Sequence, residues 1–320
     1  MKSLTPASLH QALGALCFGL LSGCGGGDSY GTASTASSGG STSTTGGLTA
    51  GVLCTLSTSV FNASTSVNAN STSSWSCSGS SRMLTSNGLP DHAVGTFPNA
   101  NNPNAISAQN VSATFTLSPT VTTTATQTGG PAGSFSYVLN GVKIDPGTAG
   151  SCNDSGSSCS LLGNEGSWSI EALGQKSFNF GVDSNNAHVQ PGGSYHYHGM
   201  PEGYLTKLGK GTAMTLIGWA GDGFPIYARY GYNSANDAGS GVRVIKSSYR
   251  LKATPDAKRP ATSLYAMGAF RQDYEYVAGL GDLDECNGRT GVTPEFPTAI
   301  YHYYATDTYP YLQRCVKGKL

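Results

Sequence analysis

Four consecutive residues, Tyr195-His196-Tyr197-His198, carry the clearest chemistry in the sequence because they place two imidazoles two positions apart. Side chains alternate along an extended strand, so His196 and His198 share one face and Tyr195 and Tyr197 share the other. Two imidazoles on one face are suited to binding one metal ion. We expect the two tyrosines to support these ligands from neighbouring positions.

A third histidine, His188, precedes the turn-forming segment Pro191–Gly193. If these three residues form the loop of a hairpin, His188 lies opposite His196, with Cβ atoms about 5 Å apart and His198 as a diagonal neighbour. A loop made of the two glycines alone would instead place Val189 opposite His196 and turn His188 away. The three-histidine site therefore depends on the register of this hairpin.

Two further histidines are candidate ligands. His302 lies between Tyr301 and Tyr303 and repeats the pattern of an imidazole flanked by tyrosines, and His92 follows the turn-like segment 87–91 and would reach a site from a loop. The alternative for every one of these histidines is a hydrogen bond within a tyrosine-rich core.

Carboxylates provide a separate route to chemistry. Asp222 and Glu285 are candidate catalytic residues, either beside a metal or with a histidine in a metal-free hydrolase. A carboxylate in such a position is more often a loop cap or a solvated charge. The predicted domain, residues 51–320, contains no Gly-x-Ser-x-Gly segment that would indicate a serine nucleophile.

The elements that must position these residues are predicted to be strands. Helix-forming residues are scarce and there are 44 glycines. Alternating or β-branched segments occur at 113–126, 135–144, 168–172, 178–182, 214–219, 224–230 and 300–305. We therefore expect a mainly β fold: a single sandwich-like or barrel-like domain with long loops rich in Gly, Asn and Pro, held by disulfides.

Six cysteines lie beyond the N-terminal segment. An even number in an exported chain favours disulfides, and six allow 15 connectivities. Proximity along the chain favours the pairs Cys54–Cys77, Cys152–Cys159 and Cys286–Cys315. With thiolates held in disulfides, an imidazole-dominated site favours Cu(II) or Zn(II) over Mg(II) or Ca(II).

The N-terminus resembles a bacterial lipoprotein signal. Residues 1–23 contain Lys2, an apolar stretch and small residues, and Leu21-Ser22-Gly23-Cys24 resembles a lipobox. We expect Cys24 to be lipidated and to anchor the protein to the cell envelope, with the outer membrane favoured because Gly25 follows it. Residues 24–50 are mostly Gly, Ser and Thr and are predicted to form a disordered tether, leaving 51–320 as the folded domain.

Charge excludes one class of partner. The chain has 18 basic and 18 acidic residues and no basic cluster, which argues against nucleic-acid binding. Few charges, 17 tyrosines and Asn-rich loops instead suit a neutral ligand. The main alternative to metal binding is therefore a metal-free module for a carbohydrate or another envelope component.

The motifs together resemble the YHYH protein family, named for the residues that stand here as Tyr195–His198. The resemblance extends over Ser86–His92, Leu139–Val142, Asp145–Gly147, His188, Gly218–Tyr227, Leu283–Gly288 and Ile300–Tyr303. It runs from about Asn87 to the C-terminus and does not place residues 51–85. The resemblance implies an exported domain and supplies no reaction.

Overall fold

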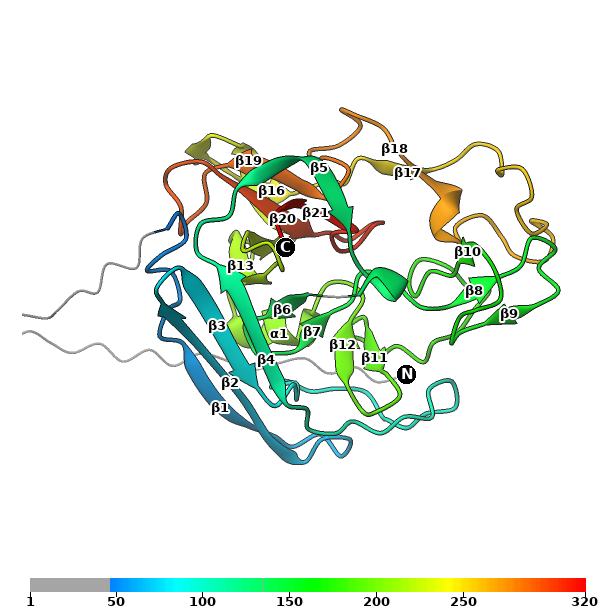
Figure 1. Cartoon of the computed structure of the whole chain (residues 1–320), viewed down its shortest axis with the longest axis horizontal. Helices are drawn as coiled ribbons and strands as arrows, with labels where there is room; N and C mark the ends of the chain where they lie inside the picture. The colour runs from blue at the N-terminus through cyan, green and yellow to red at the C-terminus, as the bar shows by residue number, and fades with distance from the viewer. Residues whose placement is uncertain (1–46, 134) are drawn as a thin grey trace, which may run out of the picture. The chain divides into compact units, whose positions relative to one another are not determined.

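A computed structural model of the chain describes residues 47–133 and 135–320 (Figure 1). The predicted signal segment 1–23, the lipidation site Cys24 and the tether up to residue 46 lie outside the described residues. Within the described part of the chain, no helix is long and apolar enough to cross a membrane.

An eight-stranded sheet forms the centre of the domain, with the strand order β11-β12-β7-β6-β13-β14-β20-β19 (Figure 1). The strands are β6 (Ser136–Val138), β7 (Lys143–Ile144), β11 (Ala187–Val189), β12 (Tyr195–Tyr197), β13 (Thr215–Trp219), β14 (Pro225–Ala228), β19 (Gly288–Gly291) and β20 (Ile300–Ala305). Neighbours are antiparallel except for the parallel pairs β12–β7 and β14–β20. Both faces of β14 and β20 are buried, which explains why these segments are almost continuously apolar or aromatic.

A second, antiparallel sheet packs against the central one. Its strands in order are β1 (Ser57–Asn62), β2 (Ala69–Ser78), β3 (Ser81–Ser86) and β4 (Val111–Thr116). Trp75 of β2 donates its indole N–H to the carbonyl of Leu139 at 2.8 Å, and the Arg82 guanidinium lies 3.5 Å from the centre of the Trp219 ring. Residues 51–85, which the resemblance did not place, thus contribute three strands to one apolar core.

The folded part includes a short segment that the sequence assigned to the tether. Thr49 is fully buried, and both its backbone N–H and its hydroxyl donate to the carbonyl of Leu117. Arg82 donates to the carbonyl of Thr49 at 2.9 Å. The ordered domain therefore begins at least two residues before the predicted start at residue 51.

Smaller elements surround the two sheets. They are β5 (Val121–Gln127) with β21 (Cys315–Gly318), β8 (Ser151–Cys152) with β9 (Cys159–Ser160) and β10 (Trp168–Ser169), β15 (Tyr230–Ser234) with β16 (Asp237–Val244), β17 (Tyr249–Leu251) with β18 (Tyr274–Tyr276), and the helices η1 (Gly130–Ala132), α1 (Glu202–Leu208) and η2 (Arg271–Asp273). The mainly β prediction is confirmed. The sheets are several, and in the described residues none closes into a barrel.

The predicted strands at 214–219, 224–230 and 300–305 are present as β13, β14 and β20. The predicted strand at 178–182 is wrong, because this segment forms no strand. Its alternating aromatic residues, Phe178 and Phe180, pack into a separate small core around Phe270 instead. Apolar residues at every second position indicate that one side of a segment is buried. A loop that crosses a core can show this pattern as well as a strand can.

All three predicted disulfides are present: Cys54–Cys77, Cys152–Cys159 and Cys286–Cys315. The first joins the segment before β1 to β2, the second bridges β8 and β9, and the third joins the segment before β19 to β21. No cysteine among the described residues is therefore available as a thiolate ligand.

Candidate metal centre

The β11–β12 hairpin has the register that the three-histidine site requires. His188 pairs directly with His196. The backbone N–H of Gln190 donates to the carbonyl of Ser194 at 3.0 Å, which closes a three-residue loop at Pro191–Gly193. The alternative two-residue loop is excluded by this pairing.

The two glycines of the loop make the turn achievable. Gly192 and Gly193 have φ angles of 93° and 86°, a region that side chains other than glycine adopt at a cost. At Gly193 an added Cβ would also lie 2.0 Å from the hydroxyl of Ser107, whereas at Gly192 it would meet nothing within 4 Å. The backbone N–H of Ser107 donates to the Gly193 carbonyl at 3.0 Å, so the loop is fastened to the preceding segment.

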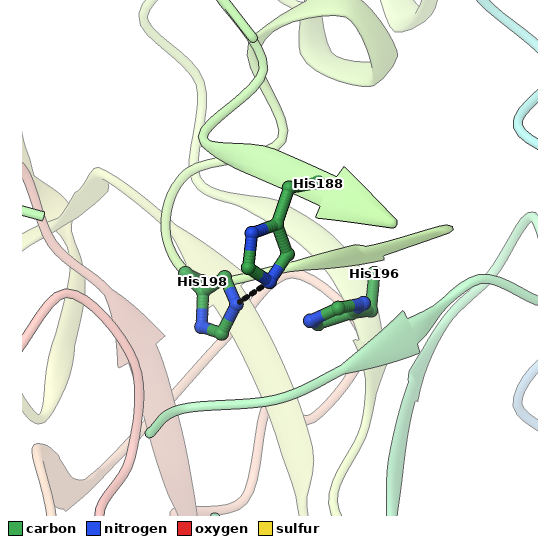
Figure 2. Close-up of side chains that lie close together, drawn as sticks. All are labelled: His188, His196 and His198. Carbon is green, nitrogen blue, oxygen red and sulfur yellow. Dashed lines mark hydrogen bonds between the residues drawn. The ribbon is translucent and has the colours of Figure 1, made fainter. Parts of the chain in front are cut away.

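Three imidazoles converge on one point at this hairpin (Figure 2). The ring centres of His188, His196 and His198 lie 4.6, 4.6 and 4.7 Å apart, and one ligand nitrogen from each ring lies within 4.8 Å of the others. The Nε2 atoms of His188 and His198 are 3.0 Å apart. Two nitrogens that bind one zinc or copper ion at about 2.0 Å are separated by roughly 3 Å, so this spacing suits a shared ion.

Backbone carbonyls orient two of the rings. His188 Nδ1 lies 3.0 Å from the carbonyl oxygen of Phe180, and His196 Nδ1 lies 3.1 Å from that of Ser194. A carbonyl oxygen only accepts, so each Nδ1 carries the proton and each Nε2 presents a lone pair. His198 Nδ1 is buried without a partner among the described residues, which leaves it free to carry the proton when Nε2 binds an ion.

Burial keeps these imidazoles neutral. His188, His196 and His198 are 9%, 1% and 3% exposed. Burial lowers the pKa of His188 and lowers the pKa values of His196 and His198 well below 6.5, and a positive charge on His188 would lower the latter two further. Neutral imidazole is the form that binds a metal ion, so at neutral pH the three rings are in a form that could hold a cation.

The three rings line a pocket of about 440 Å³, within the size range of small-molecule sites. Its walls are formed by the apolar side chains of Leu161 and Phe180, by residues 101–104, and by the polar side chains of Asp145 and Gln190. A molecule of modest size therefore has room beside the three imidazoles.

The pocket lining includes the carboxylate of Asp145, a residue that the sequence singles out only within the Asp145–Gly147 segment of the family resemblance. The parallel pair β12–β7 places Lys143 beside His196, and the backbone N–H of Asp145 donates to the carbonyl of Tyr197 at 2.9 Å. Strand alternation then puts Lys143 and Asp145 on the face of the histidines. Lys143 Nζ lies 3.2 Å from Asp145 Oδ2, and Gln190 donates to the same oxygen at 3.3 Å.

The two tyrosines of the motif face away from the three histidines, so the expectation that they support the ligands is wrong. The Tyr195 hydroxyl donates to Asp183 Oδ2 at 2.8 Å. The Tyr197 hydroxyl lies 2.6 Å from Nε2 of His92, which places His92 behind β12 as well. His92 is thus bound within this buried network and is not part of the three-histidine group.

His302 also lies elsewhere. It is on β20, five strand positions from β12, which corresponds to roughly 24 Å across the sheet. Its Nδ1 lies 2.9 Å from the carbonyl oxygen of Ile300 and its Nε2 lies 3.1 Å from the hydroxyl of Tyr304. For this residue the alternative interpretation, a histidine bonded within an aromatic core, is the one observed.

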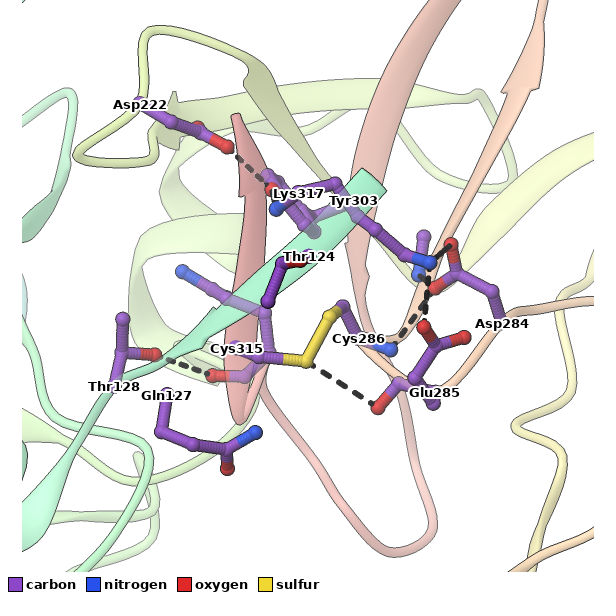
Figure 3. Close-up of a disulfide and its surroundings, with 12 residues drawn as sticks. Thr124, Gln127, Thr128, Asp222, Asp284, Glu285, Cys286, Tyr303, Cys315 and Lys317 are labelled. Atoms are coloured by element: carbon purple, nitrogen blue, oxygen red, sulfur yellow. Dashed lines mark hydrogen bonds and ion pairs between the residues drawn. A yellow bond between two sulfur atoms is a disulfide. The ribbon is translucent and has the colours of Figure 1, made fainter. Parts of the chain in front are cut away.

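Asp222 and Glu285 have structural contacts near the Cys286–Cys315 disulfide (Figure 3). Asp222 Oδ2 accepts hydrogen bonds from the Tyr303 hydroxyl at 2.5 Å and from the backbone N–H of Gly318 at 2.8 Å. Glu285 forms an ion pair with Lys317 at 2.5 Å. Neither carboxylate lines the histidine pocket, so the structure assigns neither of them a place beside the three rings.

Comparison with known proteins identifies the family of the chain. No curated protein and no solved structure matches it. The family model described as YHYH protein matches residues 112–318, which includes both strands of the histidine hairpin and excludes β1–β3. Because this match covers more than half of the 320 residues, the chain belongs to the YHYH protein family.

Proposed function

We propose that this chain is an exported, lipid-anchored YHYH protein that binds one copper or zinc ion through His188, His196 and His198. The observation that supports this most directly is the convergence of the three rings, two of which present the unprotonated Nε2 to a common point.

The donor set favours copper or zinc. Three neutral imidazoles suit these borderline ions, whereas magnesium and calcium prefer oxygen ligands. An ion held by three protein ligands keeps a coordination position for water or a small ligand, and the adjoining pocket gives such a ligand access. Bound there, zinc supplies Lewis-acid chemistry and copper supplies redox chemistry.

At the histidine pocket, the metal-free carbohydrate module is less well supported than a metal site. Its case rested in part on tyrosines available for stacking, yet among the described residues no tyrosine lines this pocket. The amides of Asn102 and Asn104, in the Asn-rich wall, already donate to the carbonyl of Val189 at 3.0 and 2.9 Å. Glycan binding at this pocket that survives a chelator would favour the module over the metal site.

Metal analysis tests the proposal. Tag-free protein purified from medium with copper and zinc is expected to contain about one ion per chain. The His196→Ala, His198→Ala double variant is expected to contain little metal, and the His302→Asn variant, which alters a buried histidine outside the group, is expected to keep it. Equal metal content in the wild type and the double variant would contradict the proposal.

The envelope anchor is tested separately. Cys24 in Leu21-Ser22-Gly23-Cys24 is the proposed site of lipidation. The full chain expressed in a bacterial host is expected in the membrane fraction, with an N-terminal peptide whose mass includes acyl chains. The Cys24→Ser variant is expected to lose both properties. A wild-type chain that retains residues 1–23 and carries no lipid would contradict the anchor.

A further inference from the structure

A second pocket, of about 410 Å³, lies beside η2 and the antiparallel pair of β17 and β18. Its lining includes two arginines, Arg271 and Arg314, and three tyrosines, Tyr249, Tyr274 and Tyr309. It shares no lining residue with the histidine pocket, so the two are separate sites.

One positive charge in this pocket is uncompensated. Arg314 donates from Nη1 and Nη2 to the two carboxylate oxygens of Glu171 at 3.0 and 2.7 Å, which neutralises it. Arg271 contacts the neutral side-chain amide of Gln127 and forms no ion pair within the described residues. A guanidinium presents a planar fork of donors that matches a carboxylate, and a single free charge favours a monoanion.

The tyrosines provide flat apolar surface next to that charge. The Tyr274 and Tyr309 rings are stacked with centres 3.6 Å apart, and Arg314 lies 5.0 Å from the centre of the Tyr309 ring. Tyr249 meets Tyr309 edge-on at 5.4 Å. Tyr309 is thereby covered, while Tyr249 and Tyr274 are half-buried and keep part of their surface for a ligand.

The positive charge lies close to the rings. Burial raises the pKa of Tyr249, and the charge of Arg271 opposes this rise. The Tyr274 hydroxyl has no hydrogen-bond partner in the described part of the chain, and burial raises its pKa, so it remains a protonated donor. The pocket thus combines a cation with aromatic surface.

We infer that this pocket binds a small aromatic monocarboxylate, with the carboxylate on Arg271 and the ring against Tyr249 and Tyr274. Both elements of recognition are needed: the guanidinium fixes the acid group, and the tyrosine rings select a flat body over an aliphatic one. This site is independent of metal binding at the histidines.

Titration calorimetry with benzoate on the full chain tests the inference. Benzoate is expected to bind. Benzamide has the same shape without the charge and is expected to bind at least roughly tenfold more weakly. Acetate lacks the ring and is also expected to bind more weakly than benzoate. Benzamide binding as tightly as benzoate would overturn the role of the charge. Phosphate or acetate binding more tightly than benzoate would overturn the ligand class.

Variants locate the binding. Arg271→Gln is expected to weaken benzoate binding roughly tenfold or more and to abolish the preference over benzamide, a readout that loss of folded protein does not mimic. Arg250→Gln removes an exposed arginine of β17 that pairs with Glu275 at 2.8 Å, and it is expected to change nothing. The His196→Ala, His198→Ala variant is expected to bind benzoate normally, which separates this inference from the metal proposal. Equal benzoate affinity in the wild type and Arg271→Gln would refute the site.

Discussion

Zinc is expected to stabilise the chelator-treated protein, because the three converged imidazoles exist only in the folded state. At a free zinc concentration 100 times the dissociation constant, binding adds about 2.7 kcal/mol to the free energy of unfolding. An unfolding entropy of about 2 cal/mol/K per residue over residues 47–320 amounts to roughly 0.6 kcal/mol/K. The midpoint of thermal unfolding is therefore expected to rise by about 5 °C.

Differential scanning calorimetry of tag-free protein, with and without zinc, measures this rise. The His196→Ala variant loses one of the three converged nitrogens and is expected to show little or no zinc-dependent shift. The His302→Asn variant keeps the group intact and is expected to shift as the wild type does. A shift of the same size in His196→Ala and the wild type would refute the reasoning, since zinc would then bind elsewhere.

The shift also depends on pH in a defined direction. Burial lowers the pKa values of His196 and His198 well below 6.5, so protons compete with zinc only at lower pH than they do for free imidazole. The zinc-dependent rise is expected to persist at about pH 6 and to disappear in stronger acid. Loss of the rise as the pH falls from 7 to about 6 would contradict the burial argument.

Three further perturbations follow from the same structure. Gly192→Ala is expected to lower the free energy of unfolding by about 1–2 kcal/mol because of the positive φ at this position. Gly193→Ala is expected to lower it further because its Cβ would clash with Ser107. Urea unfolding of the two variants measures the difference. Burial lowers the pKa of His302 from 6.5 to about 4. This difference contributes about 3 kcal/mol to the free energy of unfolding above pH 6.5, and the contribution is lost as the pH falls toward 4. In urea titrations, the His302→Asn variant is expected to lack this loss. Glu171→Gln leaves the buried charge of Arg314 unpaired and is expected to lower the free energy of unfolding by about 3–5 kcal/mol in urea.

The local part of the metal site is predictable. Strand alternation places His196 and His198 on one face, and the Pro-Gly-Gly segment restricts the hairpin to two registers. The observed pairing of His188 with His196 selects one of them. The three disulfides follow from proximity along the chain for a related reason, because each joins cysteines that short segments already hold near one another.

The long-range part of the site is not predictable from the same patterns. Asp145 reaches the histidine face through a parallel pair between β7 and β12, strands separated by many residues, and no periodicity in the sequence specifies that pair. His302 has the same tyrosine neighbours as His196 but lies five strands away. The strand order, and not the motif, decides which imidazoles meet.

The sequence by itself determined the β character and the face shared by two histidines, and it favoured the observed cysteine pairs, because strand periodicity, turn residues and chain proximity act over a few positions. The tertiary structure alone decided that the hydroxyls of Tyr195 and Tyr197 contact Asp183 and His92, that Asp145 and not Asp222 or Glu285 lines the histidine pocket, and that Arg271 has no carboxylate partner among the described residues. These outcomes depend on sheet order and on contacts between distant segments, whose energies are set by the packing of the whole domain.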